Sequence, residues 1–87
     1  MTNNDIIRKI GRVLYGENWM RPLSRELGCD ERQVRRWAND EASARKEAVM
    51  RVLDIATKRY AELGEAIRHG SMSLTIENSP ASHAAGR

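Results

Sequence analysis

Three side chains that can form bidentate hydrogen bonds lie close together in one short stretch of this sequence. Arg32 and Arg36 are four residues apart, and Gln33 lies between them. A guanidinium can donate two hydrogen bonds to O6 and N7 of guanine, and a carboxamide can pair with N6 and N7 of adenine. Glu31 precedes them, and its carboxylate would either accept from N4 of cytosine or repel a phosphate. The chemistry that this stretch predicts is the reading of base edges in duplex DNA.

The other reactive side chains do not form a catalytic or metal-binding set. Cys29 is the only cysteine and has no histidine near it in the sequence, so we expect a small buried residue and not a nucleophile. His69 and His83 are too few for a metal site with one cysteine. Oppositely charged residues four apart, such as Asp54 and Lys58, are typical of a helix surface. We therefore predict a protein that is not an enzyme and needs no cofactor or metal.

Length and charge favour a small globular protein with a polyanionic partner. A chain of 87 residues forms one small domain, and its core is marginal unless a second subunit contributes. The formal net charge is +3, with the positive excess in the first half of the chain. The single cysteine and the lack of a leader or a long apolar run lead us to expect a cytoplasmic protein with no membrane contact.

The elements that must position the polar stretch are predicted from helical spacing and from capping residues. Helices are expected over residues 4–15, 19–27 and 31–38. Asn3 or Asn4 would cap the first helix, Asn18 the second and Asp30 the third, because a short oxygen-bearing side chain accepts bonds from the first turn. Gly28 would end the second helix. The predicted fold class is therefore all-α.

A tight turn joins the second and third of these helices, which predicts a helix-turn-helix. Leu23 and Leu27 would bury one face of the first member of the pair. Val34 and Trp37 would return the second member to the same core, and Gly28 would adopt the left-handed backbone of the turn. With these residues inside, the third helix must turn its arginines toward solvent.

A helical wheel defines that outer face. When Val34 points inward, Arg32 and Arg36 fall on the opposite side, with Gln33 and Arg35 on the flanks. The candidate base-reading residues are Glu31, Arg32, Gln33 and Arg36. The candidate phosphate contacts are Met20, Arg21, Arg35, Asn39 and Arg45.

The stretch over residues 20–39 resembles the helix-turn-helix of small phage and bacterial repressors of the lambda repressor and Cro type. The positions that match the pattern are Leu23, Ser24, Leu27, Gly28, Cys29, Val34 and Trp37. The resemblance covers about residues 6–39. It implies that Glu31, Arg32 and Arg36 face base edges, and that residues near Met20, Arg21 and Asn39 meet phosphates. Ser24 departs from the usual alanine but is still small, and the long helical pattern after residue 43 departs from the family's short helices.

A fourth helical pattern runs from about residue 43 to 69, with Ser43 or Asp40 as its cap and Gly70 as its end. Apolar residues recur in it at steps of four and three, at Val49, Leu53, Ala56, Tyr60, Leu63 and Ile67. Such a helix is longer than the small core can cover, so Tyr60, Leu63 and Ile67 need a partner. We expect the same helix of a second subunit there; the alternative is a bend at Gly64 that folds the helix back on the monomer.

The end of the chain changes character. Over residues 71–77 apolar and polar residues alternate, which predicts a short strand with Met72, Leu74 and Ile76 on one side. This strand would pair with its symmetry mate in a dimer or stay loose. Residues 78–87 have the composition of a disordered tail. The predicted organisation is a DNA-binding and dimerisation domain over 1–70, followed by a strand and tail over 71–87.

These patterns favour a homodimeric transcriptional regulator that binds a palindromic site in double-stranded DNA. Among regulators, we favour a repressor. The alternative is a protein-interaction module that captures a protein partner through the C-terminal helix and strand, as the antitoxin of a toxin–antitoxin pair does. A DNA-architectural role in recombination is a third, weaker alternative.

Overall fold

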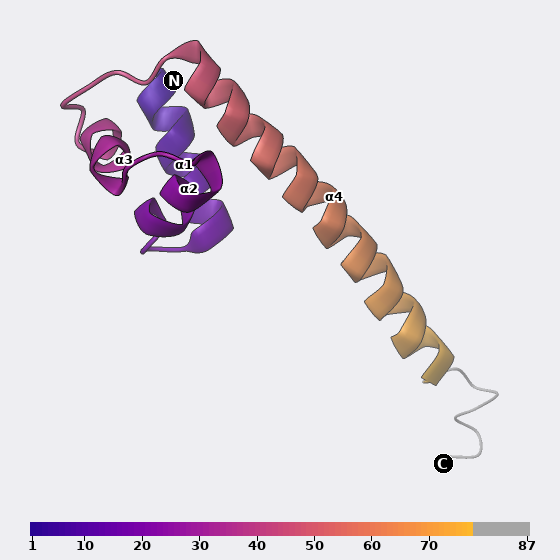
Figure 1. Cartoon of the computed structure of the whole chain (residues 1–87). Helices are drawn as coiled ribbons and strands as arrows, with labels where there is room; N and C mark the ends of the chain where they lie inside the picture. Colours follow the sequence, from indigo (N-terminus) through magenta and orange to yellow (C-terminus); the bar gives the residue numbers. More distant parts are fainter. Residues whose placement is uncertain (78–87) are drawn as a thin grey trace.

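The computed structural model describes residues 1–77, which form four helices and no strand. These are α1 (Asn3–Tyr15), α2 (Met20–Leu27), α3 (Glu31–Ala38) and α4 (Lys46–Glu77). The three short helices cluster together, and α4 projects from the cluster as one long rod (Figure 1). The Cα radius of gyration is 19.0 Å, against roughly 12 Å for a compact domain of this length. The predicted all-α class is confirmed.

Helix α1 begins one residue earlier than predicted. Its N-cap is Thr2, whose hydroxyl accepts from the main chain of Asp5, and the Asp5 carboxylate accepts from the main chain of Thr2 in return. The predicted caps Asn3 and Asn4 are wrong, since both lie inside the first turn and bond to a distant loop. A capping box satisfies two free N–H groups at once, and this leaves the asparagines available for tertiary contacts.

Helices α2 and α3 have the predicted turn between them. Gly28 has φ of +73° and donates from its main-chain nitrogen to the carbonyl of Ser24 at 2.8 Å. Asp30 caps α3 by accepting from the main chain of Arg32 at 3.0 Å, as predicted. The predicted cap Asn18 is wrong, because α2 begins after Trp19 and no side chain caps its first turn.

The core lies between the three short helices and the first turns of α4. Its buried apolar residues are Ile7, Trp19, Leu23, Leu27, Val34, Trp37, Ala44, Val49 and Val52. Trp19 packs on α1 directly over Gly11, where a built Cβ would lie 2.3 Å from Cε3 of the indole. Ser24 is buried as the helix crossing requires. The predicted inward positions of α2 and α3 are confirmed.

Helix α4 differs from the prediction at both ends. Neither Asp40 nor Ser43 caps it, since the helix starts at Lys46 and its first hydrogen bonds return to the carbonyl of Arg45. It runs without a break through Gly64 and Gly70 to Glu77, so the predicted end at Gly70 is wrong. It also does not bend back onto the cluster at Gly64 (Figure 1).

The predicted strand at Met72, Leu74 and Ile76 is wrong as well, because these residues belong to α4. A strand must pair with the edge of another strand. Each residue added to an existing helix instead gains one hydrogen bond and does not pay the cost of helix nucleation, so extending α4 is favoured. Residues two apart on a helix are about 200° apart, so this alternating set cannot share one face. The predicted tail over 78–87, with His83, lies outside the described residues.

Candidate nucleic-acid interface

Helix α3 is anchored on one side and open on the other. Val34 is fully buried and Trp37 is 7% exposed, while Arg32 and Arg36 are exposed. Within the described part of the chain α3 packs on α1 and α2 and makes no contact with α4. Figure 1 shows α3 on the opposite side of the cluster from the rod of α4. An eight-residue helix of about 12 Å length is therefore presented at one end of the molecule.

The four base-reading candidates lie on this one helix. Arg32 and Arg36 have no ion pair with any described residue and extend from the face opposite the core. Gln33 is half-buried at the flank. The carboxylate of Glu31 accepts from Nη2 of Arg35 at 3.0 Å. Because both side chains are at least one-third exposed to solvent, this pair contributes about 1 kcal/mol at most and can open when a ligand approaches.

The phosphate-contact candidates come from separate segments. Met20 and Arg21 form the first turn of α2, where no side chain caps the free N–H groups. Such a turn attracts an anion, and the exposed guanidinium of Arg21 adds a full positive charge. Asn39 is the exposed C-cap of α3, and Arg45 is exposed directly before α4. The fifth candidate, Arg35, is held by Glu31.

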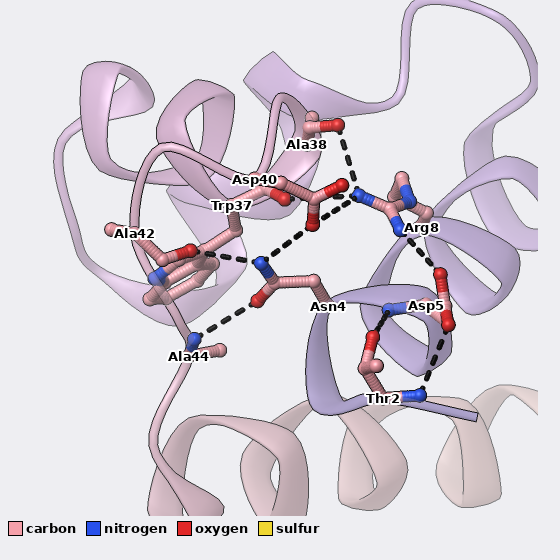
Figure 2. Close-up of polar contacts among 9 residues, drawn as sticks. All are labelled: Thr2, Asn4, Asp5, Arg8, Trp37, Ala38, Asp40, Ala42 and Ala44. Atoms are coloured by element: carbon pink, nitrogen blue, oxygen red, sulfur yellow. Dashed lines mark hydrogen bonds and ion pairs between the residues drawn. The ribbon is translucent and has the colours of Figure 1, made fainter.

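A partly exposed polar network, which the sequence patterns did not reveal, holds the C-terminal end of α3 (Figure 2). Arg8 of α1 donates from Nη1 to the main-chain carbonyls of Trp37 and Ala38 at 3.2 and 3.0 Å. The same nitrogen lies 3.0 Å from Oδ1 of Asp40, and Nη2 pairs with Asp5. The last carbonyls of a helix lack intrahelical donors, so this guanidinium satisfies two of them.

Asn4 fixes the loop between α3 and α4. Its side chain is 5% exposed and donates from Nδ2 to Asp40 at 3.0 Å and to the carbonyl of Ala42 at 2.8 Å. Its Oδ1 accepts from the main chain of Ala44 at 2.9 Å. Asp40 has φ of +59°, a left-handed conformation that a non-glycine residue holds only when its surroundings fix it. Polar residues on a helix are usually solvated, so spacing alone gave no signal for this role.

The network shifts the titration of its charged groups. Hydrogen bonds from the main chain of Thr2 and from Arg8 lower the pKa of Asp5 to about 2. Hydrogen bonds from Asn4 and Arg8 also hold the pKa of Asp40 below its usual value. The two carboxylates in turn raise the pKa of Arg8. All three groups are therefore charged at neutral pH, and their mutual attraction fixes α1 against the end of α3.

The opposite end of the helix pair is held by α4. Arg51 donates from Nη2 to the carbonyl of Leu27 at 2.5 Å, which satisfies the C-terminal end of α2. Arg59 pairs with Glu26, and its guanidinium lies 5.7 Å from the ring centroid of Tyr15. Cys29, which was expected to be buried, is only half-buried beside the core. Burial raises the pKa of its thiol, which keeps it protonated at neutral pH.

The described residues contain neither a metal-binding cluster nor a membrane-spanning helix. In residues 1–77 no group of three or more histidine, cysteine, aspartate or glutamate side chains is arranged to hold a metal ion. None of the four helices combines the length and apolar character that crossing a bilayer requires. Comparison with protein-family models, with curated proteins and with solved structures finds no match to this chain.

Proposed function

We propose that this protein recognises specific sequences in double-stranded DNA by inserting α3 into the major groove. The observation that supports this most directly is the division of α3 into two faces. Val34 and Trp37 anchor one face in the core, while Arg32 and Arg36 extend from the other into solvent. A major groove about 12 Å wide admits a helix presented in this way.

The residues around α3 supply distinct roles in this proposal. Arg32 and Arg36 donate in pairs to guanine O6 and N7, and Gln33 contacts base edges from the flank. Glu31 either accepts from cytosine N4 or keeps Arg35 oriented through their ion pair. Phosphates on either side of the groove are held by the uncapped turn at Met20 and Arg21, and by Asn39 and Arg45. Arg35 is the fifth candidate for a phosphate contact, once its ion pair with Glu31 opens.

The physiological role that follows is transcriptional regulation, as the resemblance to repressors of the lambda repressor and Cro type implies. A protein that occupies a promoter blocks the polymerase without any chemistry of its own. Two copies on a two-fold axis would place their α3 helices in successive major grooves, about 34 Å apart, and so read a palindrome. We therefore propose a repressor that binds as a homodimer.

Selection from random duplexes followed by affinity measurements tests this function. The full chain is used to enrich a preferred duplex, and dissociation constants are then measured by fluorescence anisotropy. Arg32→Ala and Arg36→Ala should each weaken binding to the preferred duplex by about 1–3 kcal/mol, or roughly 5- to 150-fold. They should leave binding to a scrambled duplex nearly unchanged.

Arg68→Ala is the matched control, since it removes the same charge from an exposed position on the rod of α4. It should retain the affinity of the wild type for the preferred duplex. If Arg32→Ala and Arg36→Ala behave like this control, or if no duplex is enriched over a random pool, the assignment of α3 as the reading helix is wrong.

A further inference from the structure

An apolar groove runs between α1 and α4 on the side of the molecule that does not carry α3. Its volume is about 720 Å³, and its apolar walls are Ile10, Val13 and Leu14 of α1 with Ala56, Tyr60 and Leu63 of α4. Lys9, Arg59 and Glu62 complete its lining. Val13 is 77% exposed and Tyr60 79% exposed. Large apolar side chains exposed to this degree are unfavourable in water unless another surface covers them.

The groove is continuous with an apolar stripe on the projecting part of α4. At about 100° per residue, Tyr60, Leu63 and Ile67 all fall within about 40° of Val49. Val49 is buried against the cluster, so the same face of the helix continues outward beyond the end of the core. Leu63 is 59% exposed and Ile67 57% exposed. The stripe therefore forms an apolar ridge directly beside an apolar groove.

We propose that the groove between α1 and α4 seats the ridge of α4 from a second copy of this chain. A surface that carries both a groove and an adjoining ridge is complementary to itself, because each copy offers what the other needs. A two-fold axis between the copies then satisfies both grooves at once, as an isologous interface requires. A second copy is favoured over a different protein because this chain already carries an apolar ridge next to the groove.

The exposed apolar area is sufficient for such a pair. The side chains of the groove and ridge together offer roughly 600 Å² per copy, the upper end of what one monomer normally exposes in a single patch. Complete cover of this patch in both copies buries at most about 1,200 Å², which is the lower limit for stable protein pairs. The marginal core of an 87-residue chain gains from the same burial.

The pairing also leaves the proposed DNA-reading helix free. Helix α3 makes no contact with α4 in the described residues, and α1 and α2 lie between them (Figure 1). Two copies joined through α1 and α4 thus keep both α3 helices exposed. The inference rests on the proposed function for its biological meaning, since a palindromic site needs a two-fold protein, but its physical evidence is separate.

Sedimentation equilibrium of the full chain without DNA tests the interface. The wild type should have about twice the monomer mass of 9.9 kDa. Val13→Glu on the α1 wall of the groove and Leu63→Glu, at a position shared by the groove and the ridge, should each weaken association by about tenfold or more, because each places a charge in an apolar contact. Both residues are exposed in the monomer, and circular dichroism should show unchanged helix content.

Met72→Glu is the matched control. Met72 is 59% exposed, the same fraction as Leu63, and it is on the same helix. It falls about 140° from Val49, away from the stripe, so this variant should associate like the wild type. If it dissociates as readily as Leu63→Glu, general repulsion explains the effect and the proposed interface is wrong.

Other outcomes separate this inference from the proposed function. If the wild type is monomeric in the absence of DNA, the proposed interface is wrong. The apolar stripe would then bind a different protein, as in an antitoxin-like module. If Leu63→Glu dissociates the pair and Val13→Glu does not, the α1 wall of the groove is outside the interface and the groove is not the seat of the ridge. Arg32→Ala should associate normally, so its loss of DNA affinity would bear on α3 alone.

Discussion

Arg8 and Asp40 are separated by 32 residues in the chain, yet Nη1 of the arginine lies 3.0 Å from Oδ1 of the aspartate. The same guanidinium donates to the carbonyls of Trp37 and Ala38 (Figure 2). A residue of α1 therefore holds the C-terminal end of α3 against the rest of the helix cluster. Any ligand of α3 meets a helix whose position is set before binding.

Arg8→Met should lower the stability of the protein, because it leaves two helix-end carbonyls and the Asp40 carboxylate without their donor. The midpoint of urea unfolding should fall, and the affinity for a preferred duplex should fall with it since α3 loses its support. Arg12→Met is the control, as Arg12 is exposed on the same helix one turn later. Equal midpoints for the two variants would contradict the role assigned to Arg8.

The stability of the protein should decrease in acid through Asp5 and Asp40. Both have a folded-state pKa below the ordinary value of 3.8, about 2 for Asp5, so folding favours their charged forms. This contribution is complete above the unfolded pKa and is lost as pH falls from about 4 toward 2. The midpoint temperature of thermal unfolding, measured from about pH 6 down to about pH 2, should therefore fall over the acid end of this range.

Asp5→Asn and Asp40→Asn should each flatten that acid dependence, because the amide cannot titrate. Asn tolerates the left-handed backbone at position 40, so the second change removes charge with little effect on geometry. Asp54→Asn on the exposed face of α4 is the control and should keep the wild-type profile. Parallel profiles for all three variants would show that the network does not contribute.

Gly11→Ala should destabilise the protein by about 1–3 kcal/mol, since the new Cβ would lie 2.3 Å from Trp19 and force the indole out of place. Gly64→Ala is a useful contrast, because a Cβ there meets nothing within 4 Å. It should stabilise the helix by about 1 kcal/mol when it is made in the Leu63→Glu variant, in which the proposed association with a second copy does not contribute to the measured stability. Chemical denaturation measures both, and similar effects would disprove the close packing of Trp19 on α1.

The salt dependence of DNA binding should report the phosphate contacts. Arg21→Ala and Arg45→Ala should each lower the slope of log K against log salt by about 0.9, because one fewer counterion is released. The loss should be equal for the preferred duplex and a scrambled one, in contrast to Arg32→Ala. A slope unchanged in either variant would remove that residue from the set of phosphate contacts.

The sequence by itself determined the parts of this protein that are governed by neighbouring residues. The capping of α3 by Asp30, the left-handed turn at Gly28 and the inward positions of Leu23, Val34 and Trp37 follow from local hydrogen bonding and helical spacing. The caps of α1 and α2 were missed by one residue, because a neighbouring threonine or an uncapped turn can serve as well as an asparagine.

Only the tertiary structure decided the features that depend on distant partners. Asn4 and Arg8 look like surface residues of a helix until the loop at Asp40 is folded against them. The alternation around Met72 favours a strand, but a strand needs an edge to pair with, and α4 simply continues in its place. Helical spacing marked Tyr60 and Leu63 as apolar positions, and the projection of α4 beyond the core left them exposed, because three short helices cannot cover a helix of 32 residues.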